Sequence, residues 1–200
     1  MRPDPFLTPY DTPRQTTPFD KITNDDFKPA LEEGMRREND EINTIINNKD
    51  TPTFENTILP LERSGELLGR VSTVMGNLIS AETNDGLEAI AEEMMPALNE
   101  HNFQISFNQK LFERVKAVYK SKPQLTDEEN KLLKDCYEGF LRRGVGLSES
   151  KKKHLQEVSM QLSTLSLQFA QNVLKDTNAF MLHITDKEEL KAILREMTEE

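Results

Sequence analysis

The sequence predicts a mainly all-α protein, an irregular multi-helix bundle with a proline-rich N-terminal arm and one short strand near the C-terminus. Apolar residues recur at steps of three and four through most of the stretch 24–178, which is the spacing of amphipathic helices. Five prolines fall within the first 23 residues and disfavour helix there. Only 179–185 alternates with the period of two that is typical of a strand.

Composition sets the broad class. The 200 residues can bury one sizeable core, so we expect one continuous domain over 1–200. A net charge of −10 argues against nucleic acid or an anionic membrane surface as a partner. No apolar run approaches the ~20 residues of a membrane-spanning helix. The single cysteine, Cys136, fits a small core residue in a reducing compartment. We therefore expect a cytoplasmic location, or a periplasmic one if a signal peptide was removed.

The arm and the first helix come first along the chain. The arm, 1–23, is predicted to be extended and packed rather than disordered, because apolar anchors are spaced along it: Phe6, Leu7, Tyr10 and Phe19. The helical body, 24–178, begins with a helix near Asn24 that has acidic residues in its first turn. Its apolar stripe comprises Phe27, Leu31, Met35, Ile42, Ile45 and Ile46.

A second helical pattern begins around Thr53. Its apolar side comprises Phe54, Ile58, Leu61, Leu68, Met75 and Ile79. Pro60 lies inside this pattern, which predicts either a kink or a helix that starts later. Glycines at helical spacing, Gly65, Gly69 and Gly76, are interpreted as places of close packing, since no glycine-rich loop joins a strand to a helix here.

Three shorter patterns complete the middle of the body. Asn84 or Asp85 caps a helix with a core face of Leu87, Ile90, Met94 and Leu98, which Pro96 should bend. Asn108 opens the next helix, whose inward residues are Leu111, Phe112, Val115, Val118 and Tyr119. Thr126 and Glu129 then form a capping box for a helix that ends at Gly144.

The longest pattern starts after Ser148 and ends at 176–178. One stripe should be buried: Leu155, Val158, Leu162, Leu165, Phe169 and Val173. Met160, Leu167 and Leu174 form a second apolar side, and a helix that is apolar on two sides is usually an interior one. The strand, 179–185, needs a partner, either a weak strand upstream or one outside these residues. A last helix, 186–200, is predicted from Leu190, Ile193, Leu194 and Met197, and it stops without a closing signal.

No catalytic motif is present in the sequence. There is no H-E-x-x-H, nucleophile elbow, P-loop or recognisable Cys-His pairing. The histidines His101, His154 and His183 are isolated from one another, and His154 with Glu157 is the nearest approach to a metal-ligand pair. A protein zinc site usually needs three or four ligands. We therefore predict no catalytic, cofactor-binding or metal residue in this chain.

Particular segments resemble a known family. They are DPFLTPYDTPRQTTPFD (4–20), TPTFENTI (51–58), SAETND (80–85), LFERVKAVY (111–119) and QFAQNVLKDTNA (168–179). Together they resemble the N-terminal region of bacterial peptidyl-dipeptidases of the thimet oligopeptidase family of zinc metallopeptidases. The resemblance implies an almost entirely helical enzyme with two halves flanking a deep channel for short peptides. It also implies that the zinc ligands, two histidines of H-E-x-x-H and a later glutamate, lie beyond residue 200.

This resemblance predicts that 1–200 is the N-terminal channel-wall portion of a zinc-dependent peptidyl-dipeptidase that releases C-terminal dipeptides from short peptides. With the catalytic domain absent, the chain alone should be inactive, and the missing C-terminal half is its expected partner. The apolar side formed by Met160, Leu167 and Leu174 should then be exposed. The alternative is a stand-alone helical protein- or peptide-binding module without catalysis. The coding sequence after Glu200 separates these two hypotheses.

Overall fold

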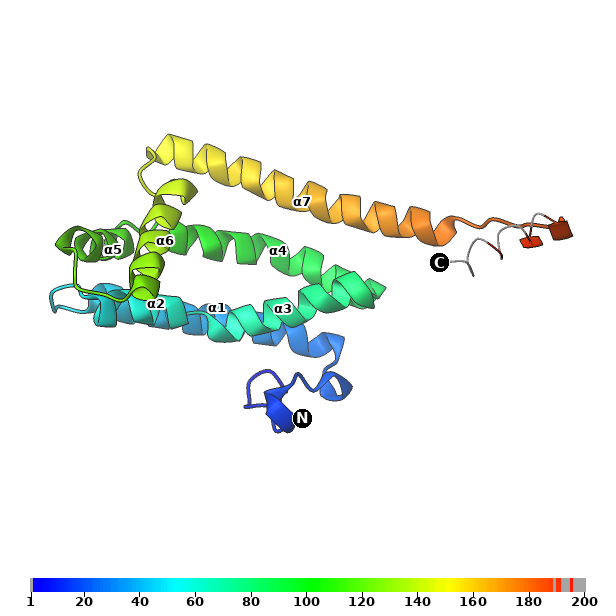
Figure 1. Cartoon of the computed structure of the whole chain (residues 1–200), viewed down its shortest axis with the longest axis horizontal. Helices are drawn as coiled ribbons and strands as arrows, with labels where there is room; N and C mark the ends of the chain where they lie inside the picture. Colours follow the sequence, from blue (N-terminus) through cyan, green and yellow to red (C-terminus); the bar gives the residue numbers. More distant parts are fainter. Residues whose placement is uncertain (1, 189, 192–194, 196–200) are drawn as a thin grey trace. The chain divides into compact units, whose positions relative to one another are not determined.

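The computed structural model describes residues 2–188, 190, 191 and 195 (Figure 1). It confirms the mainly helical fold. Its α-helices are α1 (Asn24–Asn47), α2 (Leu59–Arg63), α3 (Glu66–Ala81), α4 (Asp85–Ser106), α5 (Gln109–Ser121), α6 (Asp127–Arg143) and α7 (Glu149–Ala179). Three further short segments are helical: η1 (Pro13–Gln15) and η2 (Phe19–Lys21), which are 3-10 turns, and η3 (Phe54–Ile58), which is a π-helical turn.

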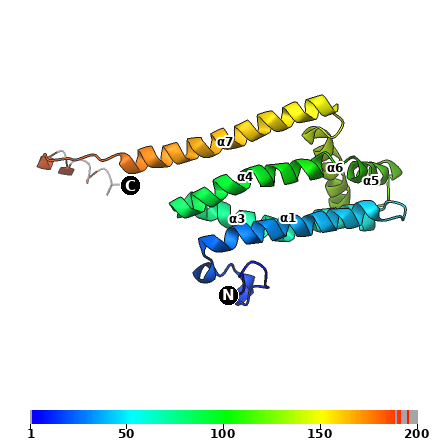
Figure 2. The same cartoon turned by 180° about the vertical axis from the view of Figure 1, so that it is seen from behind.

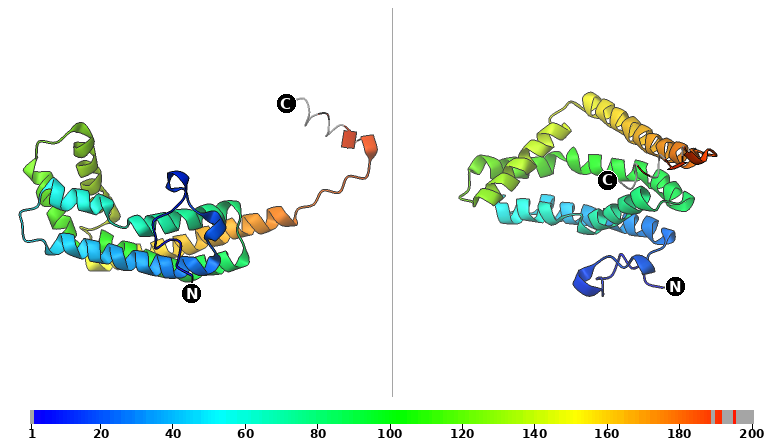
Figure 3. Two further views of the ribbon diagram at one scale, coloured as in Figure 1. Left: turned by 90° about the horizontal axis from the view of Figure 1, so that it is seen from below. Right: turned by 45° about the vertical axis from the view of Figure 1, so that its right-hand side comes forward.

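The chain divides into two units, Met1–Met160 and Gln161–Glu200, and α7 contributes to both. Within the first unit, α1 packs against α3 and α4 (Figures 2 and 3), while α5 packs against α6 and η3. In Figure 1, α6 crosses the direction of α1 and α4 instead of running alongside them. The arrangement is therefore an irregular bundle, as the unequal helix lengths predict.

Two apolar clusters hold the first unit together. The first joins the arm to α1, α3 and α4, and its largest members are Phe6, Phe27, Leu31, Val71, Leu87 and Met94. The second joins α1, η3, α5 and α6 through Ile45, Phe54, Ile58, Leu111, Val115 and Phe140. Most of these residues come from the apolar stripes that the sequence predicts, and Phe6 is a predicted anchor of the arm, but Val71 and Phe140 lie outside those stripes. Burial of such side chains stabilises the fold by roughly 1.5–3 kcal/mol each.

Polar caps set where the helices begin and end. Thr23 and Asp26 form a capping box at the start of α1, and Thr126 and Glu129 form the predicted one at the start of α6. At the other end of α6, Gly144 has φ of 94°, a left-handed conformation that glycine adopts without steric cost. The capping signals in the sequence therefore predicted these ends correctly.

The N-terminal arm packs against the body through Phe6. The Phe6 ring is fully buried, with its centroid 5.1 Å from that of Phe27. The backbone oxygen of Phe6 accepts a hydrogen bond of 2.7 Å from Nη2 of Arg70, and the Arg70 guanidinium also lies over the ring of Tyr10. Phe19, in contrast, is more than half exposed, so its predicted role as an anchor is wrong. The arm is also not uniformly extended, because η1 and η2 interrupt it.

The pattern predicted as one helix from Thr53 is divided at two places. Pro60 is the second residue of α2, which follows the π-helical turn η3 directly, and α3 starts later, at Glu66. Between the two helices, Gly65 has φ of 71° and lies against the carboxylate of Glu38. Helical turns therefore begin at Phe54, directly after Thr53, and the break before the long helix α3 lies at Gly65 and not at Pro60.

The strand predicted for 179–185 is wrong. Ala179 is the last residue of α7, and 180–186 have no regular structure, with Phe180 76% exposed. The described residues contain no strand that could pair with this segment, and an isolated strand leaves its backbone groups without partners. Of the last predicted helix, 186–200, the residues Ile193, Leu194 and Met197 lie outside the described part of the chain.

The stripe of α7 that was predicted to be buried is exposed along most of its length. Leu155 is half-buried, but the later members of the stripe are exposed: Val158, Leu162, Leu165, Phe169 and Val173. On the opposite side, Leu167 is half-buried and Leu174 is exposed. The spacing of apolar residues predicted the helix correctly, but it carried no information about which surface would cover it.

Candidate functional site

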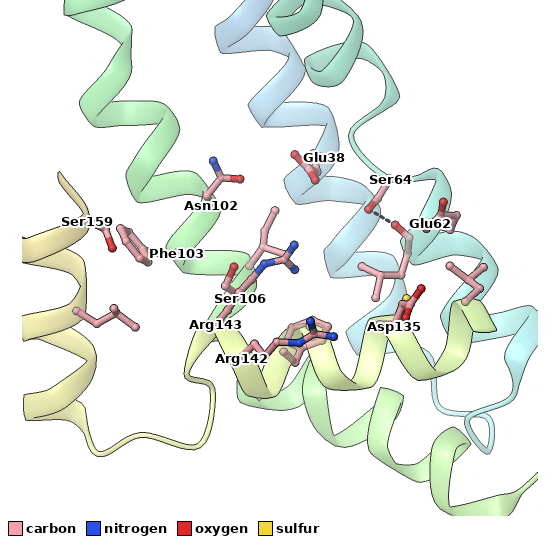
Figure 4. A pocket seen from close by; sticks show the side chains of 17 residues that line it. Glu38, Glu62, Ser64, Asn102, Phe103, Ser106, Asp135, Arg142, Arg143 and Ser159 are labelled. Carbon is pink, nitrogen blue, oxygen red and sulfur yellow. Dashed lines mark hydrogen bonds between the residues drawn. The ribbon is translucent and has the colours of Figure 1, made fainter. Parts of the chain in front are cut away.

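A pocket of about 670 Å³ lies within the first unit (Figure 4). Residues from α1, α2, α4, α6 and the first turns of α7 line it. Its apolar lining comprises Leu61, Phe103, Ile105, Leu132, Phe140 and Leu155. Cavities of 300–1,000 Å³ with an apolar lining and a few polar groups are the usual sites for small ligands. This pocket is therefore the candidate site of the first unit.

Five ionic side chains line the pocket, and three of them have partners of opposite charge or hydrogen-bonding partners. Oε2 of Glu38 lies 2.7 Å from Nε2 of His101. Nη2 of Arg142 lies 3.1 Å from Oε2 of Glu138, and Asp135 is paired with Lys131. Glu62 and Arg143 are the other two, and neither forms an ion pair or a side-chain hydrogen bond with any described residue. One uncompensated charge of each sign thus faces the pocket.

Glu38 lies on α1, and its carboxylate contacts His101 and Gly65. His101 is 4% exposed and comes from α4, so the hydrogen bond between them joins two helices at the edge of the pocket. The absence of a side chain at Gly65 matters here, because a Cβ atom there would lie 2.6 Å from the Glu38 carboxylate. In the sequence His101 is isolated from the other histidines, and nothing near it points to Glu38. No short-range signal could have found the pair, since the two residues are 63 positions apart.

Cys136 also lines the pocket and packs partly against the second apolar cluster. Burial raises the pKa of its thiol to about 11, and the nearby carboxylates of Glu62 and Asp135 act in the same direction. At neutral pH the side chain is therefore a protonated thiol and a poor nucleophile. This environment agrees with the interpretation of Cys136 as a small, largely apolar residue.

The remaining histidines do not form a metal site with the described residues. Nδ1 of His154 lies 3.9 Å from Oε2 of Glu157, and both side chains are exposed. His183 is exposed in the irregular segment after α7. No group of three histidine, cysteine, aspartate or glutamate side chains in the described part of the chain is placed to hold a metal ion. These residues therefore do not fit a catalytic zinc ion, which needs three protein ligands.

None of the described helices is long and apolar enough to cross a membrane. No family model matches the chain.

Similarity to known proteins does reveal relatives. The chain is 35% identical over 185 residues, 92% of its length, to a dipeptidyl carboxypeptidase of Escherichia coli, and equally to one of Salmonella typhimurium. It is 25% identical over 189 residues, 94% of its length, to oligopeptidase A of Escherichia coli. The chain is therefore similar, over nearly its whole length, to these peptidases. It spans 27% of the length of each of these three relatives.

Two of the segments that carry the resemblance to the thimet oligopeptidase family contact each other. Arg114, from LFERVKAVY on α5, donates hydrogen bonds to the backbone oxygen of Asn48 at 2.8 Å and to Oδ1 of Asn56 at 3.1 Å. Asn56 belongs to TPTFENTI, and its Oδ1 also accepts from the backbone N–H of Thr53 at 2.8 Å. A planar guanidinium can hold several oxygens at once, so Arg114 fixes the turn between α1 and η3 against α5.

Proposed function

We propose that this chain is the N-terminal helical portion of a zinc-dependent peptidyl-dipeptidase. The parent enzyme hydrolyses short peptides and releases dipeptides from their C-termini, and this portion forms one wall of the substrate channel. The observation that carries the proposal is the 35% identity over 92% of the chain to dipeptidyl carboxypeptidases. The parent's compartment is proposed to be the cytoplasm, with the periplasm as the alternative.

In this proposal the chain shapes and supports the channel, and the chemistry is performed elsewhere. The described residues offer no metal-binding cluster, and Cys136 is a protonated thiol at neutral pH. The zinc ion and its ligands are therefore assigned to the missing C-terminal catalytic half. A rigid helical wall contributes to hydrolysis by orienting the peptide and limiting the access of water.

Two measurements test the proposal. The coding sequence after Glu200 should continue in frame and encode H-E-x-x-H. The purified full gene product should contain one zinc ion per chain and release a C-terminal dipeptide from an N-blocked tetrapeptide, and a chelator should abolish this activity. Residues 1–200 alone should bind no stoichiometric zinc and cleave nothing. Cleavage by residues 1–200, or an inactive full product without zinc, would contradict the proposal.

The alternative is a stand-alone helical module that binds a peptide without cleaving it. The pocket favours this alternative, because it has the size of a ligand site and two uncompensated charges. A stop codon directly after Glu200 would support the module and exclude the peptidase.

A further inference from the structure

The two uncompensated charges of the pocket come from different helices. Glu62 lies on α2, and Arg143 is the last residue of α6. In Figure 4 the Arg143 side chain extends toward the pocket from beside Ser106, whereas Glu62 lies on the other side, beyond Ser64. The pocket therefore presents a positive group and a negative group from separate elements. Neither of them forms an ion pair or a side-chain hydrogen bond with a described residue.

Apart from its ionic side chains and the polar residues Ser64, Asn102, Ser106 and Ser159, the lining of the pocket is apolar. Leu61, Phe103, Ile105 and Phe140 contribute to the lining, and the thiol of Cys136 carries no charge at neutral pH. Such a surface favours apolar side chains of a ligand, because it removes them from water without requiring hydrogen bonds. The other ionic residues compete little for the charges of a ligand, because Glu38, Asp135 and Arg142 already have partners.

We propose that this pocket binds an apolar dipeptide in its zwitterionic form, with the carboxylate at Arg143 and the ammonium group at Glu62. A free dipeptide carries both charges at its ends and apolar side chains between them. The guanidinium can bind a carboxylate through two parallel hydrogen bonds, and the Glu62 carboxylate can accept hydrogen bonds from an ammonium group. This site uses residues of 1–200 only and is independent of the peptidase activity of the parent.

The test is a titration of residues 1–200 with phenylalanyl-leucine, in which binding is measured by isothermal titration calorimetry and by changes in amide chemical shifts. At about 10 mM, a ligand with a Kd of about 1 mM occupies roughly nine tenths of the sites. We expect saturable binding, with the shift changes concentrated around the pocket-lining parts of α2, α4 and α6. N-acetylation or C-amidation of the dipeptide should each raise the Kd about fivefold, because exposed ion pairs contribute modestly.

Two variants test which residue binds which charged end of the dipeptide. Arg143→Gln should weaken binding of the free dipeptide about fivefold but leave the affinity for the C-amidated form unchanged. Glu62→Gln should weaken binding of the free dipeptide similarly but leave the affinity for the N-acetylated form unchanged. Both residues are exposed, so the fold should be retained, which far-ultraviolet circular dichroism checks.

Arg142→Gln and Asp135→Asn are the matched controls, since they remove the same charges from side chains that already have partners. They should leave the Kd unchanged. Equal losses in the controls would show general electrostatic attraction and overturn the assignment. Absence of saturable binding, or equal affinity for the free and blocked dipeptides, would overturn the site itself. Because residues 1–200 need no catalytic activity in this titration, these results are independent of the outcome for the proposed peptidase.

Discussion

Nε2 of His101 lies 2.7 Å from Oε2 of Glu38, and this contact joins α4 to α1 at a position where the imidazole is almost fully buried. A buried polar group contributes little to stability when it has a partner, but it costs about 1–3 kcal/mol when the partner is removed. The pair therefore connects the packing of two helices to the shape of the pocket that Glu38 lines.

Glu38→Ala should lower the free energy of unfolding by about 1–3 kcal/mol, because it leaves His101 buried without its partner. Glu38→Gln keeps an acceptor oxygen and should cost less. Glu113→Ala, which removes the exposed partner of Lys116, is the control and should change stability by less than about 1 kcal/mol. Urea unfolding followed by circular dichroism measures all three. A Glu38→Ala variant no less stable than the control would contradict the role of the pair.

Gly34 and Gly69 provide a second prediction, because both lie in helices but meet different surroundings. A Cβ atom at Gly34 would lie 2.9 Å from Cα of Leu68, so α1 and α3 would have to separate. Gly34→Ala should therefore destabilise the protein by about 1–3 kcal/mol. At Gly69 no heavy atom lies within 4 Å of such a Cβ, so Gly69→Ala should stabilise α3 by about 0.5–1 kcal/mol. Thermal unfolding of the two variants should shift Tm in opposite directions, and a shift in the same direction would show that the helices do not pack as described.

Much of the helical fold could be predicted from the sequence, but the absence of a strand at 179–185 could not. Apolar spacing and capping residues are local signals, so they predicted the start of α1 and both ends of α6. The alternation in 179–185 was also a local signal, but a strand exists only when another strand pairs with it. The second pattern is divided at Gly65, which its spacing indicated only as a place of close packing, whereas the two alternatives were predicted for Pro60.

The candidate site could not be predicted, because its residues are distant in sequence. Three of its ionic residues come from different helices: Glu38, Glu62 and Arg143. In the sequence, each of them is indistinguishable from an ordinary solvent-exposed charged residue. Within the lining of the pocket, Glu62 and Arg143 differ from Glu38, Asp135 and Arg142 in the lack of a described partner, which only three-dimensional structure can reveal. The interpretation of Cys136 as a small core residue needed only its place in an apolar pattern, and it agrees with its partial burial.

Cys136 gives a prediction of pH dependence. Burial, together with Glu62 and Asp135, raises the pKa of its thiol from 9.0 to about 11, so the thiolate at pH 8 is about a hundredfold scarcer than in the unfolded chain. Labelling by a disulfide reagent should be correspondingly slow at pH 8 and accelerate toward pH 11. In urea it should be fast at pH 8. Glu62→Gln should lower the pKa of Cys136 and speed the labelling, and labelling of the folded protein as fast as in urea would contradict the raised pKa.

The same shift has a consequence for stability. Between pH 9 and about 11 the unfolded chain has released the thiol proton while the folded protein still holds it. The folded state therefore binds more protons, and the free energy of unfolding should fall as the pH rises through this range. Cys136→Ala should lack this contribution, which urea unfolding at pH 8 and pH 10.5 can measure.

The last prediction concerns the apolar stripe of α7. Phe169 is 71% exposed, and Leu165 and Leu162, one and two turns before it, are exposed as well. Exposed apolar side chains in a row favour association, because contact with another apolar surface removes them from water. Residues 1–200 should therefore bind a hydrophobic dye or self-associate, which fluorescence and light scattering measure. The variant Leu165→Ser with Phe169→Ser should reduce both, since it replaces two strongly exposed members of the stripe.

Ala170→Ser is the matched control, because Ala170 is exposed on α7 but lies outside the stripe. It makes the same kind of change to the helix without removing a large apolar side chain, so dye binding and association should stay as in the unchanged chain. If the double variant and the control changed dye binding and self-association equally, the stripe would not be the surface responsible for them. A monodisperse monomer that binds no dye would show that the stripe is covered in solution by residues of the same chain.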